Sequence, residues 1–433
     1  MQLYSEGKNY KLYEGNMLDL LEVIDPDSID SVITDPPYEL NFMGKGWDNS
    51  GIAFQPSTWE KCYKVLKPGG YLLAFGGSRT FHRIAVAIED AGFEIRDTIC
   101  WLYGSGFPKS YNIGLAIDKK NGVQSEVVGN SRSGVSSRAF QSEELTTAGE
   151  YEIRKAQNEW DGWGTALKPA YEPVIIARKP CEGSCIDNVQ KYGVGGINID
   201  ECRIPTDDYL YNHGNSKGTV DSYSVGNFGK AIKGENRSTE LGRFPSNVIL
   251  TYDEEDEQEV CGGMPYCHGA GNVKEANISE TYNNSSYIAG NYKHNPNYYN
   301  DEGSASRYFY CAKASGKDRD EGLEAFEKFQ GGTYQFRQDG SLDGGVPERK
   351  NIHPTVKPCE LMQYLIRLVT PKGGVILDPF NGSGSTGKAT MYENKEKYSE
   401  YRYIGIELTP EYLPIAEARI NYVTKLTRPI KLF

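Results

Sequence analysis

The apolar positions of the chain alternate between short runs and helical periods, which predicts an α/β fold. Short apolar or β-branched runs indicate buried strands at residues 10–13, 31–34, 71–75, 93–103, 172–178, 374–378 and 403–407. Helical spacing of apolar residues predicts helices near residues 17–23, 59–66, 80–90 and 360–369, and another from Lys388. Helix–stop–strand units recur, with stops at Lys67–Gly70 and Pro371–Gly374. This repetition favours a doubly wound, mostly parallel sheet.

Two stretches lack such periods. Residues 116–158 are polar, and we predict an insertion or flexible loop there. Beyond Pro180 the composition shifts to Gly, Asn, Ser and Tyr, and an acidic run occupies residues 253–257. At 433 residues the chain exceeds one ordinary core. We therefore divide it into a first part of the core (1–180), an inserted module (181–345) and a second part of the core (346–433).

A polar corner follows the strand that ends at Thr34. It consists of Asp35, Pro36, Pro37 and Tyr38. Each proline lacks an N–H, so the corner offers carbonyl acceptors and a carboxylate with few competing donors. Such a corner suits a ligand that donates hydrogens, such as the amino group of a nucleobase, and Tyr38 supplies a flat face for its ring. The same residues also form ordinary strand-to-loop turns.

A second polar segment lies near the other end of the chain. The strand ending in Asp378 is followed by Gly382, Gly384 and Gly387 in a G-x-G-x-x-G pattern that opens a helix. Twenty residues after Gly387, another strand ends in Glu407, the position expected to hold two ribose hydroxyls. Together these features predict a nucleoside-containing cofactor.

Two other interpretations compete for the glycine-rich segment. It nearly fits the phosphate loop G-x-x-x-x-G-K-[ST], but Ala389 stands where a metal-binding hydroxyl is needed. A dinucleotide dehydrogenase normally carries its glycine fingerprint on the first βαβ unit, whereas this one lies about fifty residues from the C-terminus. Both interpretations are therefore disfavoured.

A third segment, His353-Pro-Thr-Val-Lys-Pro358, precedes the helix at residues 360–369. With Asp35-Pro-Pro-Tyr38 and Asp378-Pro-Phe-Asn-Gly-Ser-Gly384, it resembles the amino-methyltransferases that act on DNA, in the group whose catalytic motif precedes the cofactor loop. The resemblance covers roughly residues 1–115, 160–180 and 350–433. It implies a Rossmann-like methyltransferase sheet, with residues 181–345 as the target-recognition module.

The resemblance also implies a reaction and a set of site residues. The donor is S-adenosylmethionine and no metal is required. The expected product is N6-methyladenine in double-stranded DNA, formed on a flipped base. Asp35 and the Pro36 carbonyl accept the amino hydrogens, Pro37 completes the motif, and Tyr38 stacks on the base. The cofactor residues implied are Asn16, Thr355, Lys357, Asp378, Phe380, Gly382, Gly384, Thr386 and Glu407.

These cofactor residues have separate expected roles. Phe380, Gly382, Gly384 and Thr386 line the methionine half of the cofactor, while Asp378 and Glu407 fix polar groups. Thr355 and Lys357 hold its carboxylate, Lys357 through its positive charge. Asn16 stands where the family usually has an Asp that contacts the adenine, so it departs from the pattern.

Other functions stay open at this point. Relatives that methylate cytosine at N4 more often carry Ser in place of Asp35, so Asp35 favours adenine without excluding cytosine. A non-catalytic DNA-binding protein that kept the cofactor fold, and an RNA methyltransferase, are the alternatives. The recognition sequence, a homodimer and a partner restriction nuclease are left undecided.

The net charge of −12 counts against a nucleic-acid partner unless basic residues gather on one face. The candidates are Lys109, Arg203, Lys230, Lys233, Arg237, Arg243 and Arg307. A Gly- and aromatic-containing segment, Asn41–Asp48, is either a lid over the site or a plain surface loop.

The cysteines and the chain ends bear on metal binding and on the compartment. Cys181, Cys185, Cys202, Cys261 and Cys267 lack the paired spacing of a zinc site. Nine scattered cysteines, no membrane-length apolar run and no signal sequence predict a cytoplasmic protein. The resemblance implies that the cell is a bacterium or a bacterium infected by a virus.

Overall fold

The computed structural model describes residues 2–40, 46–103, 110–131, 151–205, 242–253, 266–268, 302–304, 309–314, 316–330 and 348–426. Its centre is a ten-stranded mixed sheet in the order β1-β2-β16-β15-β3-β4-β8-β5-β9-β12. The strands are β1 (Gln2–Gly7), β2 (Tyr10–Glu14), β3 (Ile29–Thr34), β4 (Leu66–Phe75), β5 (Glu94–Tyr103), β8 (Tyr171–Arg178), β9 (Val248–Asp253), β12 (Tyr310–Ala314), β15 (Val375–Asp378) and β16 (Arg402–Glu407). Most neighbouring pairs are parallel, as predicted; β1–β2, β4–β8 and β8–β5 are antiparallel.

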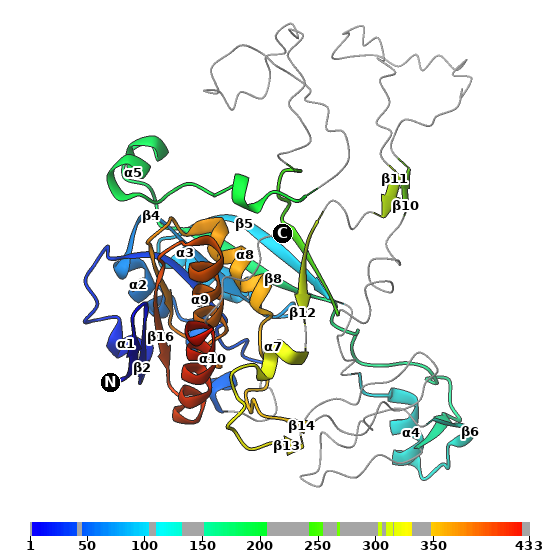
Figure 1. The fold of residues 1–433 in the computed structure, drawn as a ribbon. Coiled ribbons are helices and arrows are strands. Elements are labelled where there is room, and N and C mark those ends of the chain that lie inside the picture. Colours follow the sequence, from blue (N-terminus) through cyan, green and yellow to red (C-terminus); the bar gives the residue numbers. More distant parts are fainter. Residues whose placement is uncertain are drawn as a thin grey trace, which may run out of the picture.

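Helices cover both faces of this sheet (Figure 1). On one face, side chains of α8 (Cys359–Val369), α9 (Ser385–Lys397) and α10 (Leu413–Lys425) pack against Leu73 and Phe75 of β4. On the other face, α1 (Met17–Leu20), α2 (Pro56–Val65) and α3 (Phe81–Asp90) pack against Leu72 and Ala74. Successive strand residues thus enter opposite cores, which is the pattern of a sheet buried on both sides.

The chain changes direction across the sheet between β15 and β3. From β3 it continues to β4 on one side, and from β15 to β16 on the other. The two central strands are parallel, with Leu377 beside Val32. In open α/β sheets the crevice outside the carboxyl ends of the strands at such a point is where ligands bind. Asp35 and the loop after Asp378 both start there.

Of the two alternatives predicted for residues 116–158, a flexible loop is wrong in the described parts, which form a folded insertion between β5 and β8. α4 (Ile113–Asn121) extends into this segment, capped by the Asn112 side chain and ended by Gly122 in a left-handed conformation. A hairpin of β6 (Glu126–Ser131) and β7 (Tyr151–Lys155) follows. The buried Asp118 carboxylate accepts hydrogen bonds from Asn158 and from the backbone N–H of Gln157. Polar tertiary contacts hold this lobe, so it has little apolar periodicity; Figure 1 shows it beside the main body.

The segment predicted as an inserted module, 181–345, is partly continuous with the sheet. β9 pairs with β5, and β12 pairs with β9, both in parallel. The segment also contains α5 (Cys185–Tyr192), which starts with a capping box formed by Ser184 and Asp187, and α7 (Gly316–Asp320). The remaining strands are β10 (Tyr266–His268), β11 (Glu302–Ser304), β13 (Phe329–Gln330) and β14 (Glu348–Arg349), in two small hairpins. In the described part of the chain, no helix has the length and apolarity needed to span a membrane.

Candidate active site

A cleft of 1220 Å³ opens at the carboxyl ends of β3 and β15. It is larger than the usual range for a small-ligand pocket, which is about 300–1,000 Å³, and so has room for two ligands side by side. Twelve of the residues predicted from the sequence line it: Asn16, Asp35, Pro36, Pro37, Tyr38, Thr355, Lys357, Asp378, Phe380, Gly382, Thr386 and Glu407. The structure therefore brings the three sequence segments to one site.

The Asp35 carboxylate faces a buried lysine. Lys357 Nζ lies 2.6 Å from Asp35 Oδ2 and 3.4 Å from Glu172 Oε2. Burial acts to lower the pKa of Lys357, but the charges of Asp35 and Glu172 outweigh it and raise that pKa. The other oxygen of Asp35, Oδ1, is buried and has no hydrogen-bond partner among the described residues. An unmatched buried acceptor is costly, which marks this atom as a place for a ligand donor.

Glu172 was predicted from the sequence only as part of a strand, yet it contacts Tyr38 of the corner that follows β3. The Tyr38 hydroxyl donates to Glu172 Oε2 at 2.8 Å, and Tyr103 lies 3.3 Å from the other oxygen. Burial and the nearby carboxylates raise the pKa of Tyr38 well above its usual range, so its hydroxyl stays protonated. No local motif identifies Glu172, because its partners come from β5 and from the corner after β3.

Asp378 connects the two central strands. Its Oδ1 accepts hydrogen bonds from the Thr34 hydroxyl at 2.7 Å and the Phe380 N–H at 3.2 Å, and its Oδ2 accepts from the Thr386 hydroxyl at 2.7 Å. Burial raises the pKa of Asp378 to about 6, although these three donors act in the opposite direction. Asp378 and Thr386 therefore fix the shape of the loop as well as lining the cleft.

The glycines of the loop serve different purposes. Gly382 has φ of 51°, and a Cβ added there would lie 2.8 Å from His353 Nε2 at the cleft wall. Gly384 has φ of 73° and is not among the described residues that line the cleft. A Cβ on Gly384 would lie 2.9 Å from Ala416 Cα on α10. The absent side chain of Gly384 thus lets α10 approach, where the sequence had suggested a ligand contact.

Glu407 lies at the end of β16, as expected, and both of its oxygens bind backbone. Oε2 accepts from the Gly382 N–H at 2.7 Å and Oε1 from the Thr409 N–H at 2.8 Å. Burial raises the pKa of Glu407, against the effect of these N–H groups. Asn16 is the N-cap of α1, with its side-chain oxygen accepting from Leu18 N.

The segment before α8 also lines the cleft and lies against the glycine loop at Gly382. His353 Nδ1 lies 2.6 Å from the Thr355 carbonyl oxygen, and its ring packs edge-on against Tyr412. Burial lowers the pKa of His353 to about 4, so its ring is neutral at physiological pH. Arg319, on α7, donates to the Asn351 and His353 carbonyls, and its Nε is buried with no partner in the described ranges. Arg319 also lines the cleft and was not predicted.

The phosphate-loop interpretation fails on the position of its lysine. Lys388 is fully buried, and its Nζ lies 2.5 Å from Asp318 Oδ1 and 3.0 Å from Glu321 Oε2. Arg419, also fully buried, donates to the Ser383 carbonyl at 2.7 Å and supports the loop from behind. Both cations stabilise the packing of α7, α9 and α10 rather than a phosphate in the cleft.

Several predicted contacts lie outside the described residues. These are Lys109, Lys230, Lys233, Arg237, Arg307, Cys261 and the first part of the predicted lid, residues 41–45. Arg203 is described and pairs with Asp200 at 2.8 Å. Where residues are described, no three His, Cys, Asp or Glu side chains gather as metal ligands.

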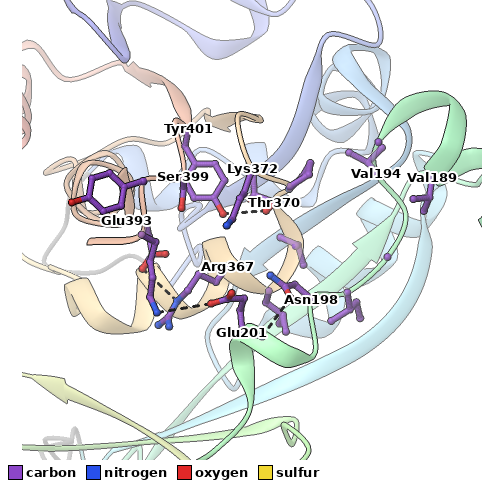
Figure 2. A pocket seen from close by; sticks show the side chains of 18 of the residues that line it. Val189, Val194, Asn198, Glu201, Arg367, Thr370, Lys372, Glu393, Ser399 and Tyr401 are labelled. Carbon is purple, nitrogen blue, oxygen red and sulfur yellow. Dashed lines mark hydrogen bonds and ion pairs between the residues drawn. The ribbon is translucent and has the colours of Figure 1, made fainter. Parts of the chain in front are cut away.

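A second cavity, of 470 Å³, lies near the amino ends of β15 and β16, at the opposite edge of the sheet (Figure 2). Glu393 in its wall points toward Arg367, at 3.3 Å, and the Tyr401 hydroxyl donates to the Thr370 carbonyl. None of the predicted site residues is among the described residues that line it. The chemistry predicted from the sequence therefore belongs to the larger cleft.

Several known proteins are similar to this chain. The type II methyltransferase M2.DpnII of Streptococcus pneumoniae is 42% identical over 82 residues, which are 19% of this chain and 28% of that protein. M.HindIII of Haemophilus influenzae is 21% identical over 231 residues, 43% of this chain and 64% of that protein. The chain thus spans less than two thirds of the length of these relatives.

Solved structures that match the chain include the PvuII DNA methyltransferase, described as cytosine-N4-specific, at 15% identity and a TM-score of 0.43, covering 99% of this chain and 92% of that one. The M1.HpyAVI–SAM complex has 15% identity and a TM-score of 0.38, covering 95% and 99%. The DNA methylase family of N6 and N4 methyltransferases matches residues 29–418. Because this match extends over most of the chain, the protein belongs to the N6/N4 DNA methylase family.

Proposed function

We propose that this protein transfers a methyl group from S-adenosylmethionine to the exocyclic amino group of a base in DNA, and that the base is adenine, methylated at N6. The observation that carries the proposal is the Asp35 carboxylate. One of its oxygens is held by Lys357 and the other, Oδ1, is buried without a partner among the described residues, in the same cleft as the glycine loop.

An aromatic amine is a poor nucleophile because its lone pair is delocalised into the ring. Asp35 Oδ1 accepts one amino hydrogen and the Pro36 carbonyl accepts the other, so the lone pair becomes localised on nitrogen. The Tyr38 ring, oriented by the hydrogen bond from its hydroxyl to Glu172, stacks on the flipped base. As the new N–C bond forms, the bond from the methyl carbon to the sulfur of the donor would break, and its electron pair would stay on the sulfur, which leaves as a neutral thioether. The nitrogen then loses one proton to solvent and is neutral again.

The residues of the cleft fit the cofactor. Glu407 accepts from two backbone N–H groups and keeps acceptor capacity for the ribose hydroxyls. Phe380, Gly382 and Thr386 line the same cleft as Asp35 and are our candidates for the methionine half, and Asn16, which also lines it, is our candidate for the adenine. When bound, the cofactor supplies an electrophilic methyl group. Arg319 and Thr355 line the cleft and are our candidates for its carboxylate.

Adenine is preferred to cytosine because Asp35 supplies a carboxylate where cytosine-N4 enzymes of this family more often have Ser. A carboxylate accepts strongly from the amino group of the base. The alternative, a DNA-binding protein without activity, is disfavoured since Asp35, Tyr38 and the glycine loop are all intact and assembled in one cleft.

The test is sequencing, able to detect modified bases, of DNA from cells that express the protein, Asp35→Ala or the matched control Asp25→Ala. Asp25 is exposed and lies outside the cleft lining. We expect N6-methyladenine within one short motif for wild type and Asp25→Ala, and none for Asp35→Ala. Modified cytosine would overturn the choice of base. No modification by a folded protein that binds S-adenosylmethionine would overturn the proposed activity.

A further inference from the structure

Among the described residues, four cationic side chains line the cleft, those of Arg79, Lys168, Arg319 and Lys357, and Lys357 is the one that contacts Asp35. The sequence assigned Lys357 to the carboxylate of the cofactor, but its surroundings indicate a different role. Its side chain is 8% exposed and its Nζ lies 2.6 Å from Asp35 Oδ2. A buried ammonium is stable only with its charge matched, and Asp35 and Glu172 already provide that match.

The Lys357 ammonium is also confined by aromatic rings. Its Nζ lies 4.9 Å from the centroid of Phe75, 5.4 Å from that of Tyr38 and 6.0 Å from that of Trp101. Cations are attracted to such ring faces, which adds to the ionic contacts. Phe75 and Trp101 come from β4 and β5, so the position of Lys357 is set by the sheet itself.

Glu172 links Lys357 to the side chain of Tyr38. It accepts from the Tyr38 hydroxyl at 2.8 Å, and Lys357 Nζ lies 3.2 Å from the same hydroxyl oxygen. Asp35, Tyr38, Glu172 and Lys357 therefore form one closed network of ionic and hydrogen bonds. Fixing Oδ2 of Asp35 leaves Oδ1 as the oxygen available to an incoming donor.

We propose that Lys357 and Glu172 are positioning residues that hold Asp35 in one orientation for the amino group of the base, and that Lys357 does not serve chiefly as a cofactor ligand. This inference rests on the proposed function. It assigns the cofactor carboxylate to Arg319, whose Nε is buried without a partner in the part of the chain that the structure describes. Removal of the Lys357 cation should then lower kcat, whereas removal of the Arg319 cation should raise the Kd for S-adenosylmethionine.

The first experiment compares Lys357→Met, Lys357→Arg, Arg319→Met and the exposed control Lys372→Met. Calorimetry gives the Kd for S-adenosylmethionine, and methyl transfer at saturating cofactor and DNA gives kcat. We expect Lys357→Met to lower kcat by about 10²-fold with Kd within about threefold of wild type. Arg319→Met should raise Kd by about tenfold or more and affect kcat less. A raised Kd with unchanged kcat in Lys357→Met would overturn the proposal.

The conservative variant separates positioning from general damage. Lys357→Arg keeps a cation opposite Asp35 and Glu172, so it should restore part of the kcat that Lys357→Met loses. A kcat for Lys357→Arg no higher than that of Lys357→Met would contradict the proposed role.

A readout that needs no activity comes from thermal unfolding of wild type, Lys357→Met, Asp35→Asn and the double variant. If the two residues stabilise each other, the loss of Tm in the double variant is smaller than the sum of the two single losses. Additive losses would overturn the proposal even if methyl transfer proceeds. If wild type transfers no methyl group, the proposed function fails, while this cycle still decides the Asp35–Lys357 coupling.

Discussion

The hydroxyl of Thr34 donates a 2.7 Å hydrogen bond to Asp378 Oδ1, joining residues 344 positions apart in the sequence. Thr34 is the last residue of β3 and directly precedes Asp35, whereas Asp378 is the last residue of β15 and precedes the glycine loop. This bond therefore links the Asp35–Tyr38 corner to the glycine loop, the two segments proposed to bind the base and the cofactor. Both side chains are buried, so solvent does not compete for it.

We expect Asp378 to give a pH-dependent contribution to stability. The pKa of this carboxyl is 3.8 ordinarily and is raised by burial to about 6 in the folded protein. The folded state therefore binds the proton more tightly, so the contribution is fully present below about pH 4 and is lost as the pH rises through about 6. Its size is of the order of 2–3 kcal/mol.

Asp378→Asn isolates this contribution, because an amide does not titrate. Free energies of unfolding from urea titrations between pH 4 and 8 provide the comparison. The free energy of unfolding of wild type, relative to that of Asp378→Asn, should fall as the pH rises. A difference that is flat with pH would show that Asp378 does not titrate in this range.

Gly384→Ala should destabilise the protein more than Gly373→Ala. Both glycines have positive φ, 73° and 76°, so each alanine adds backbone strain of about 1–2 kcal/mol. A Cβ at Gly373 meets no atom within 4 Å, whereas one at Gly384 lies 2.9 Å from Ala416 Cα. Chemical denaturation should show a further loss of about 1–3 kcal/mol for Gly384→Ala. Equal losses of stability in the two variants would mean that α10 moves away from the methyl group added at position 384 at no cost in free energy.

Glu407→Ala should weaken binding of S-adenosylmethionine by about tenfold or more. The variant loses the proposed acceptor of the ribose hydroxyls and the partner of the Gly382 N–H. Glu411→Ala is the control, since that side chain is exposed and does not line the cleft. Calorimetric titration of the two variants tests this, and unchanged affinity in Glu407→Ala would remove Glu407 from the cofactor site.

Lys388→Met should lower the stability of the protein without changing its binding of nucleotides. The substitution leaves Asp318 and Glu321 without this cation, and removing one partner of a buried ion pair typically costs about 3–5 kcal/mol. Lys372→Met, on an exposed side chain, should change stability by less than about 0.5 kcal/mol. Urea denaturation provides both values. Tight ATP binding by wild type that is lost in Lys388→Met would revive the phosphate-loop interpretation.

The sequence by itself determined the local elements and the order of the motifs. Short apolar runs predicted β3, β15 and β16 closely, because a strand buried on both faces has little choice of residue type. Asp35, Asp378 and Glu407 stand at the carboxyl ends of these strands, so the prediction of the strands also located these residues. Parallel strands end at one edge of a sheet, so the prediction of a common cleft followed from the fold class.

The tertiary structure decided which of these residues meet. Lys357 was assigned to the cofactor from its charge alone, but only the packing of the segment before α8 against β4 and β5 places it on Asp35. Glu172 and Arg319 have no local signal, since their partners come from distant elements. Gly384 matched a ligand-binding pattern, yet α10, which the sequence analysis did not predict, explains it.

The placement of whole helices and strands was also only partly predicted from the sequence. Residues 116–158 and 181–345 have weak apolar periods, so the α4 lobe and the addition of β9 and β12 to the sheet were not predicted. Hydrogen bonds such as those to Asp118 hold these parts, and they depend on residues about forty positions away. Periodicity reports which face of an element is buried, whereas the identity of its neighbour depends on contacts that only the folded chain makes.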